Sequence, residues 1–587
     1  MDNLISRILT AGRQSEEETF ENHIRQWFPI ALAIGIVVGA VMSIFHMIII
    51  LFSRILLEIN PLVIMTIAAF VILLLNRIEF EDPKQNGISY VLTKKHSEET
   101  IPIEVGGKKF VSSSLVLGSG MPVGREGPAL IIGSSIASKI VELAKVPEAY
   151  RHQAITLGSA ASTGALFQAP FGSAVFSAEV PYKEDSDHSM LMAAFLSSVV
   201  AAVTAATIVK FVNGLNFLDF SFHFISRSNA FLQPNFQNAF FALLLGVITG
   251  LIGRLFIEIY YIYIDKMSER FSVQKQMIYG YIFFFMSIAL GGLFISDFYV
   301  LRGITPFEEI DNLIDSSQTN QTLIIMIFIQ ILATTALLGA GYPGGIFAPS
   351  LFIGALTGLF FSTILQFNDP NEIAAWAIIG MSGAHAATTK TPVASVLLIL
   401  EITGLPNLII PILLVNISSY IFSGHRSLYK GQIRGRDAII LRHLKEYDQH
   451  EGYTVGDVMT RLEDTMYLTK ETTLTESMKI FDESSKRDFP VIQSTDDLTV
   501  IGMVFEEELL IIKEEGLDYI VEDFMETKIP NISMSLTGRD ALTLLLDADI
   551  ERAPVVDSNK KLIGIVSIGD IVRGHQTLIE IQKITKQ

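Results

Sequence analysis

The 587-residue sequence is half apolar and only 18% charged, which excludes an ordinary water-soluble protein of this length. Its formal net charge of −18 argues against a nucleic-acid partner, and its lack of cysteine excludes disulfides and thiolate metal sites. From residue 445 to the end there are 29 acidic and 15 basic side chains, so −14 of the −18 charges lie there. We therefore expect an apolar membrane part followed by an acidic, water-soluble part.

Apolar segments long enough to cross a membrane follow one another from residue 27 to residue 422. FPIALAIGIVVGAVMSIFHMIIILF and MIYGYIFFFMSIALGGLFI are two of them, and a hydrocarbon core is about 30 Å thick. We expect residues 27–430 to form an all-α, multi-pass membrane domain. Residues 1–26 are polar and charged, which predicts a cytoplasmic N-terminal segment and a first apolar span that is retained as a signal-anchor.

A strongly basic junction, GHRSLYKGQIRGRDAIILRHLK, joins the two parts, and we assign residues 431–454 as a basic linker. Basic loops next to membrane spans stay on the cytoplasmic side, so we expect both termini in the cytoplasm. The polar interval 79–109 is interpreted as a cytoplasmic connection, and the acidic loop YKEDSDH (182–188) as a solvated surface.

The membrane domain contains an internal repeat. GREGPALIIG (124–133) and GIFAPSLFIG (345–354) share the pattern Gly-x-x-x-Pro-x-Leu-x-Ile-Gly. At nearly the same offset, GSAASTGALFQAPFGSAVFSAE (158–179) matches GMSGAHAATTKTPVASVLLILE (380–401). These matches predict two inverted repeats of short, tilted and broken helices, at about 27–212 and 238–430, with a binding site between them.

Both Gly-x-x-x-Pro stretches place glycine and proline where a helix would begin. A helix N-terminus presents free N–H groups and about half a positive charge, so it binds an anion without a full charge and lets it leave. The repeat therefore predicts an anion pathway. Glu126 occurs in the first copy only, and a carboxylate there would compete with the anion and move aside when displaced or protonated. We expect Glu126 to be the gate.

GREGP, GGIFAP and the late tyrosine in SLYKGQI together resemble the CLC family of chloride channels and proton-coupled chloride exchangers, over about residues 30–430. The resemblance implies a homodimer in the lipid bilayer, with one chloride pathway per subunit and no enzymatic activity. It also implies that Glu126 is the external gating residue and that the hydroxyl of Tyr429 points at the central anion. The residues whose surroundings would coordinate the anion are Arg125, Gly127, Ile346, Phe347 and Ala348.

The sequence departs from the family at its first anion motif, GSGIP. A near-match, GSGMP at 118–122, lies too close to GREGP, so we place the motif at QNGISYVL. There Asn86 replaces the serine and Ser89 the proline, while Gly87 is retained. An asparagine amide can also donate to an anion, and its greater bulk would alter selectivity.

A second departure concerns the mechanism. Exchangers of this family carry two adjacent glutamates at the end of the helix that begins with Ala-Pro-Phe or Ala-Pro-Leu. The second of these glutamates is the internal proton site. Here Glu179 matches the first, but Val180 occupies the second position and cannot carry a proton. This favours passive, channel-like conduction gated by voltage or pH. The alternative is a proton-coupled chloride antiporter in which water carries the proton.

The water-soluble part repeats as well. Residues 455–514 and 519–577 share a V-x-D-(V/F)-M opening, an amphipathic helix and two apolar strands, and they resemble an α/β CBS pair, followed by a tail at 578–587. The resemblance implies that Ser567 and Asp570 bind a nucleotide, with the carboxylate on a ribose. Phe505 and Glu508 replace this pair in the first copy. We expect one adenine nucleotide or cyclic dinucleotide at most, and a purely structural, dimer-forming pair is the alternative.

Two other membrane classes that carry CBS pairs do not fit. A zinc protease would need His-Glu-x-x-His, which the sequence lacks. A magnesium pore would need acidic residues along the membrane path, where the repeat offers helix N-termini. We therefore expect no catalytic residue, no metal site and no required cofactor.

Overall fold

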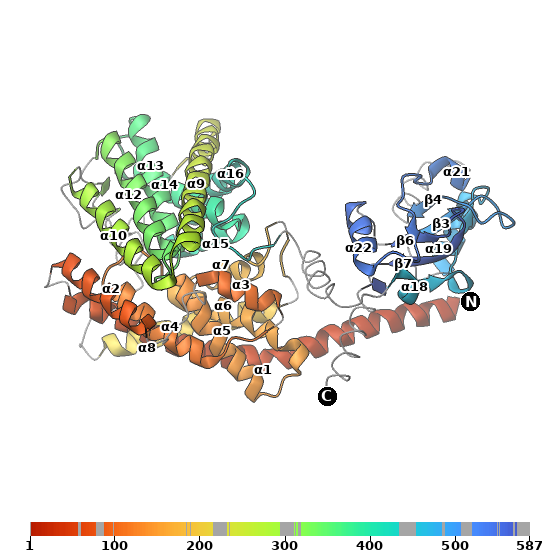
Figure 1. Ribbon diagram of the computed structural model, residues 1–587, viewed down its shortest axis with the longest axis horizontal. Coiled ribbons are helices and arrows are strands. Elements are labelled where there is room, and N and C mark those ends of the chain that lie inside the picture. Colours follow the sequence, from red (N-terminus) through yellow and green to blue (C-terminus); the bar gives the residue numbers. More distant parts are fainter. Residues whose placement is uncertain are drawn as a thin grey trace. The chain divides into compact units, whose positions relative to one another are not determined.

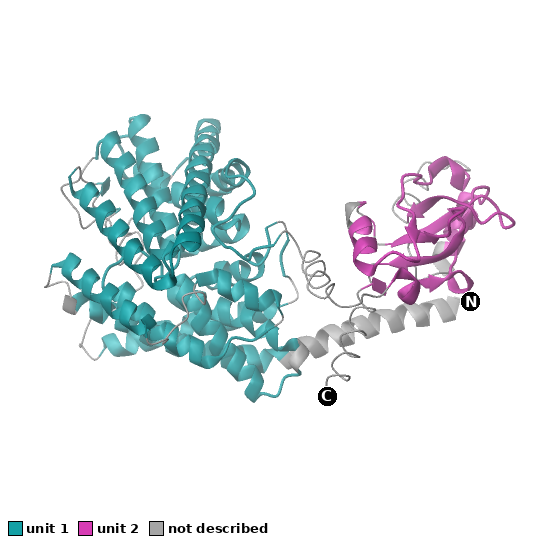
Figure 2. Cartoon of the chain, in the orientation of Figure 1, with its two compact units in different colours: residues 1–435 teal, residues 436–587 magenta. Residues whose placement is uncertain are grey.

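The computed structural model has two compact units, residues 1–435 and 436–587, which Figure 2 colours separately. The structure describes residues 2–56, 60–77, 87–97, 99–183, 185–187, 190–214, 230, 232–233, 235–293, 310, 313–314, 318–433, 454–483, 488–505, 519–548, 550, 552–567 and 570–571.

Unit 1 is built from helices (Figure 1). Its first half contains α1 (Asp2–Leu56), α2 (Pro61–Arg77), α3 (Gly87–His96), α4 (Ile103–Gly118), α5 (Glu126–Leu143), α6 (Ala154–Phe167), α7 (Pro170–Glu179) and α8 (Leu191–Asn213). Its second half contains α9 (Phe236–Arg270), α10 (Val273–Gly292), α12 (Asn320–Gly339), α13 (Phe347–Ile364), α14 (Pro370–Thr389), α15 (Pro392–Thr403) and α16 (Ile409–Phe422).

The helices of unit 1 suit a membrane. Among the described residues, five segments are long and apolar enough to span one: Trp27–Arg54, Leu191–Asn213, Phe236–Arg270, Asn320–Gly339 and Phe347–Ile364. Others are shorter apolar helices, which cross only part of a hydrocarbon core. The predicted all-α membrane domain of long and short helices is confirmed.

The sequence repeat is also a structural repeat. A turn with a positive-φ glycine precedes both α5 and α13, at Gly120 (φ 86°) and Gly341 (φ 92°). The GSGMP stretch is therefore this turn at the end of α4 and not a helix start. Both α6 and α14 end on a left-handed residue, Gln168 and Lys390, and a helix with a proline at its start follows each of them.

Small residues let the helices within each half approach closely. A Cβ added at Gly158 on α6 would lie 2.4 Å from the Gly133 carbonyl oxygen on α5. In the second half, a Cβ at Gly354 on α13 would lie 2.3 Å from the Gly380 carbonyl oxygen on α14. The repeated glycines therefore maintain two equivalent helix crossings.

Two carboxylates join the halves reciprocally. Glu179, at the end of α7, accepts the N–H groups of Val393 (3.2 Å) and Ala394 (2.7 Å) in the first turn of α15. Glu401 on α15 accepts those of Phe171 (3.1 Å) and Gly172 (2.6 Å) in the first turn of α7. Each half thus caps a helix N-terminus of the other, where a negative charge is favourable.

Unit 2 contains two copies of one small α/β arrangement. The first has α18 (Val455–Val458), β1 (Thr460–Arg461), β2 (Leu468–Thr469), α19 (Leu474–Glu483), β3 (Asp488–Ile492) and β4 (Val500–Phe505). The second has α21 (Val521–Phe524), β5 (Ile532–Ser533), α22 (Gly538–Asp547), β6 (Arg552–Val556) and β7 (Leu562–Ser567). The strand orders are β2-β3-β4 and β1-β7-β6-β5. Strand β1, which belongs to the first copy, is therefore an edge strand in the sheet of the second copy.

The copies share a register and pack on each other. Val491 faces Gly502 in one hairpin and Val555 faces Gly564 in the other, each followed by a register shift. Asp488 and Arg552, which begin β3 and β6, form an ion pair between the copies at 3.5 Å. An apolar cluster joins the two hairpins: Ile492, Val500, Val556 and Leu562. The predicted α/β pair is confirmed.

Candidate anion site

The starts of α5 and α13 lie together although they are 221 residues apart. Gly124 and Gly345 pair as an antiparallel bridge, in which each backbone N–H donates to the carbonyl of the other glycine at 2.7 Å. The next residues, Arg125 and Ile346, are the N-cap residues of the two helices. Two helix N-termini, each with unsatisfied N–H groups, therefore face the same small region.

The Glu126 side chain occupies this region. The residue is 1% exposed, and its Oε1 accepts the backbone N–H of Phe347, the first residue of α13, at 2.5 Å. Its Oε2 has no hydrogen-bond partner among the described residues. A carboxylate that accepts an N–H at a helix N-terminus takes the position that a bound anion would take.

Two glycines leave room for this carboxylate. A Cβ added at Gly345 would lie 2.0 Å from Oε1 of Glu126, and one added at Gly124 would lie 2.2 Å from Oε2. Neither glycine has a positive φ, so the backbone itself would accept alanine there. Space for the side chain, and not backbone conformation, is what requires glycine at both positions.

The predicted site residues divide into backbone and side-chain roles. The Arg125 side chain points elsewhere, because its Nη1 contacts Nδ1 of His46 at 3.1 Å and its guanidinium lies 5.5 Å from the ring centre of Phe167. The Phe167 ring stacks on that of Phe347 at 4.5 Å. Gly127, Ile346 and Ala348 belong to the first turns or the caps of the two helices, and at this site they offer only backbone groups.

A third helix start reaches the site. Gly87 (φ 66°) begins α3, and its Cα would lie 3.2 Å from a Cβ added at Gly127. Ser89 on α3 accepts the backbone N–H of Lys430 at 2.9 Å, which joins this helix to the segment that carries Tyr429. Asn86 lies outside the described residues. The interval interpreted as a cytoplasmic connection therefore contains a helix whose first turn lies at the site.

The Tyr429 side chain completes the group. It is 5% exposed, and its hydroxyl has no hydrogen-bond partner among the described residues. The next residue, Lys430, donates its backbone N–H to the Ser89 hydroxyl on α3, which places the Tyr429 segment beside this helix. A buried hydroxyl without a protein partner suits donation to a bound anion.

Val180 is 2% exposed and closes α7, with its N–H donated to the Phe176 carbonyl at 2.8 Å. The side chain before it, Glu179, caps α15. The position where an internal proton site would stand is therefore apolar, and the adjacent carboxylate serves the junction of the halves.

Sequence reasoning missed a buried charged pair. Lys95 on α3 binds Asp187 at 2.8 Å, and their side chains are only 8% and 15% exposed. The acidic loop was predicted to be a solvated surface, and that prediction was wrong for Asp187. The sequence held one indication, since Lys95 continues the helical spacing of Val91 and Leu92 on the buried face of α3, but it gave no partner.

In unit 2, Asp570 accepts the backbone N–H of Ser567 at 3.0 Å and its hydroxyl at 2.7 Å, while the Asp570 N–H donates to that hydroxyl at 3.1 Å. The two predicted nucleotide-binding residues thus lie together in a reciprocal cap. Phe505 ends β4 in the first copy, and Glu508 lies outside the described residues.

Known proteins resemble both parts of the chain. The model of the CBS domain matches residues 455–514 and 521–575. The chain is 27% identical to the H(+)/Cl(-) exchange transporter ClcA of Vibrio campbellii, over 56% of this chain and 71% of that protein, and equally identical to ClcA of Vibrio vulnificus, over 53% and 65%. A crystal structure of a eukaryotic CLC transporter superposes with a TM-score of 0.55, at 18% identity, over 93% of this chain and 98% of that one.

The model of the voltage gated chloride channel family matches residues 64–424, which is more than half of the chain. That family transports anions and is not a family of enzymes. The protein is a multi-pass membrane protein and belongs to the voltage gated chloride channel (CLC) family.

Proposed function

We propose that the protein exchanges chloride for protons across the membrane, with Glu126 as the external gate and as the group that carries the proton. One observation carries this proposal: the Glu126 carboxylate accepts the Phe347 N–H at the start of α13, where chloride would bind. Chloride and the ionised carboxylate then compete for one position. Protonation removes the negative charge, weakens the bond to the N–H and frees the position for chloride.

The same geometry supplies ligands for the anion. The first turns of α5 and α13 offer backbone N–H groups, and the Tyr429 hydroxyl offers a further donor. These donors carry only partial charge, which permits binding and release. Asn86 is proposed as a donor from the segment before Gly87.

Exchange is favoured over passive conduction because the named relatives are H(+)/Cl(-) exchange transporters. Passive conduction, which the sequence favoured, remains the second candidate because Val180 has no proton to give. Under exchange, ordered water or another titratable group must carry the proton past Val180 towards Glu126.

Exchange and passive conduction differ in one measurable respect: only exchange lets chloride efflux drive protons against their own gradient. Purified protein in liposomes loaded with chloride is placed in low-chloride buffer, and external pH and chloride are recorded together. Exchange predicts that chloride leaving drives protons inward, so the outside becomes alkaline. Glu126→Ala should abolish this proton movement and retain chloride flux. Chloride flux without proton movement in the wild type would establish passive conduction, and no chloride flux at all would refute anion transport.

We further propose a homodimer with one pathway per subunit and with both termini in the cytoplasm. Apolar side chains on α16 are exposed in the single chain, among them Ile410 (55%), Ile417 (55%) and Ile421 (65%), and α8 exposes Val203 (61%). These faces offer a large apolar contact for a second copy. Cross-linking of single cysteines at 417 and 421 in membranes should yield dimers, and its failure at every α8 and α16 position would contradict this contact.

A further inference from the structure

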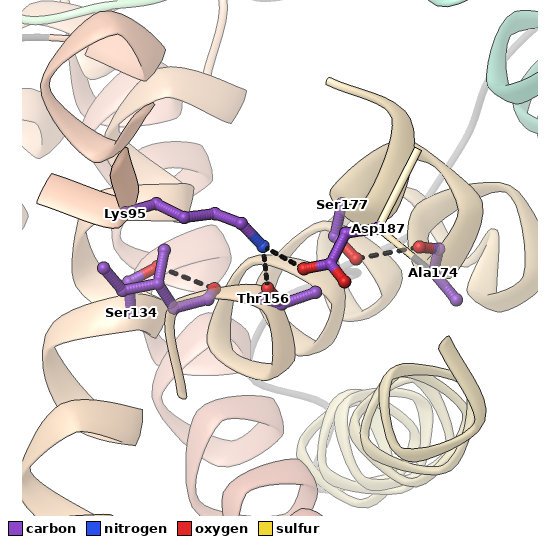
Figure 3. Close-up of polar contacts among 7 residues, drawn as sticks. Lys95, Ser134, Thr156, Ala174, Ser177 and Asp187 are labelled. Carbon is purple, nitrogen blue, oxygen red and sulfur yellow. Dashed lines mark hydrogen bonds and ion pairs between the residues drawn. The ribbon is translucent and has the colours of Figure 1, made fainter. Parts of the chain in front are cut away.

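A buried ion pair connects three separate parts of the first half (Figure 3). Lys95 lies in the last turn of α3, and its Nζ binds Oδ2 of Asp187 at 2.8 Å. The same Nζ donates to the hydroxyl of Thr156 on α6. Both charged side chains are largely shielded from solvent, at 8% and 15% exposure.

Asp187 is itself fixed to α7. Its backbone N–H donates to the carbonyl of Ala178 at 2.9 Å, in the last turn of that helix. A second contact joins the same two regions, because the His96 ring lies 5.7 Å from that of Tyr182. The end of α3 is therefore held against α6 and against the chain that follows α7.

Burying two opposite charges gives little net stability, because their desolvation offsets most of their attraction. In some proteins such a pair specifies a conformation more than it contributes free energy. The position defined here is that of α3. This helix has 10 residues and a length of about 15 Å, so a shift at Lys95 moves its first turn as well.

The first turn of α3 is part of the candidate anion site. Gly87 lies against Gly127 of α5, and Ser89 accepts the N–H of Lys430, next to Tyr429. A displaced α3 would therefore move both a helix N-terminus and the tyrosine segment away from the anion.

We propose that Lys95 and Asp187 are positioning residues for anion binding: their ion pair holds α3 so that Gly87 and the Tyr429 segment stay at the anion site. This inference rests on the proposed chloride transport. It assigns the pair no contact with the ion and no transported proton.

The test compares variants in liposomes by the chloride concentration for half-maximal flux and by the maximal flux. Lys95→Met and Asp187→Asn each break the pair. The double variant Lys95→Met/Asp187→Leu removes both charges, which avoids leaving one of them buried alone. The matched control is Lys94→Met, because the neighbouring Lys94 side chain pairs with Glu99, only five residues away, and with no distant residue in the described part of the chain.

We expect the pair-breaking variants, the folded double variant included, to need about tenfold more chloride for half-maximal flux, because misplacing a binding group by about 1 Å costs up to roughly 100-fold. Lys94→Met should match the wild type, and Lys95→Arg should recover most of the affinity. Unchanged chloride dependence in the folded double variant would overturn the inference. So would loss of proton coupling in Asp187→Asn at unchanged chloride affinity, since Asp187 would then carry protons. If the wild type moves no chloride, the proposed function fails instead.

Discussion

Replacing Gly345 by alanine should displace the Glu126 side chain without touching the glutamate itself. The added Cβ would lie 2.0 Å from Oε1 and 2.4 Å from the carboxyl carbon, far inside van der Waals contact. These atoms are the free end of a flexible side chain, whereas the Gly345 backbone is held by its bridge to Gly124. The carboxylate is therefore the group that moves, and it loses its bond to the Phe347 N–H.

The size of the effect follows from that lost bond. A hydrogen bond to a charged group contributes about 1.5–3 kcal/mol, and each 1.4 kcal/mol is about a factor of ten in an equilibrium constant. Gly345→Ala should therefore shift the balance between the closed and open positions of Glu126 by roughly 10- to 100-fold. If Glu126 is the gate, chloride flux should rise towards the level of Glu126→Ala.

Chloride efflux from liposomes measures this, with the protein's oligomeric state and melting temperature as checks on folding. The matched control is Gly344→Ala, because a Cβ there would meet Val123, 2.6 Å from its Cβ, and not the carboxylate. The double variant Gly345→Ala/Glu126→Ala should conduct no faster than Glu126→Ala alone, since both changes act on one group. Fully additive effects, or a folded Gly345→Ala protein with wild-type flux, would refute the reasoning.

Three further predictions concern stability and the second unit. Glu179→Gln and Glu401→Gln should each destabilise the membrane unit by about 1–3 kcal/mol, and by similar amounts, because each removes a charged cap from the other half; thermal unfolding in detergent compares them. If Asp570 contacts a ribose, millimolar AMP or ATP should raise the melting temperature of unit 2 in the full-length protein, and Asp570→Ala should abolish that rise. The backbone N–H and hydroxyl of Thr454 hold the pKa of Asp457 below its usual value, so the stability it contributes is present above about pH 4 and is lost as pH falls through the lowered pKa. Asp457→Asn should therefore lower the melting temperature of unit 2 at neutral pH and reduce its loss on acidification.

The sequence predicted the structure best at positions where the residue type itself indicates a local structure, such as glycine and proline at a helix start. The glycine and proline of each repeat marked the starts of α5 and α13, and the matching Glu179 and Glu401 marked equivalent helix ends. In unit 2, the shared Pro-Val and Gly-apolar-Val patterns lie on paired strands, and the two resulting hairpins have the same register. Local chemistry determines these features, so they can be predicted from a single chain.

Contacts between distant residues could not be predicted in the same way. The bond from Glu126 to the Phe347 N–H spans 221 positions, and that from Lys95 to Asp187 spans 92. The helix α3 was missed because it is only ten residues long and ends in three polar side chains, Lys94, Lys95 and His96. The Asp187 loop reads as solvated because nothing near it in the sequence shows that a lysine of another helix approaches it.

The two halves have nearly the same fold but contribute unequally to the candidate site. Phe347 occupies in the second half the place that Glu126 occupies in the first, and its ring stacks on Phe167 and lies edge-on to His385 at 4.7 Å. The second half thus offers an N–H group and an apolar ring where the first offers a carboxylate. A carboxylate at both positions would place two like charges close together, and they would repel each other. A single acid facing a single helix start allows the closed position, so the difference between the repeats matters to the proposed gate as much as their likeness.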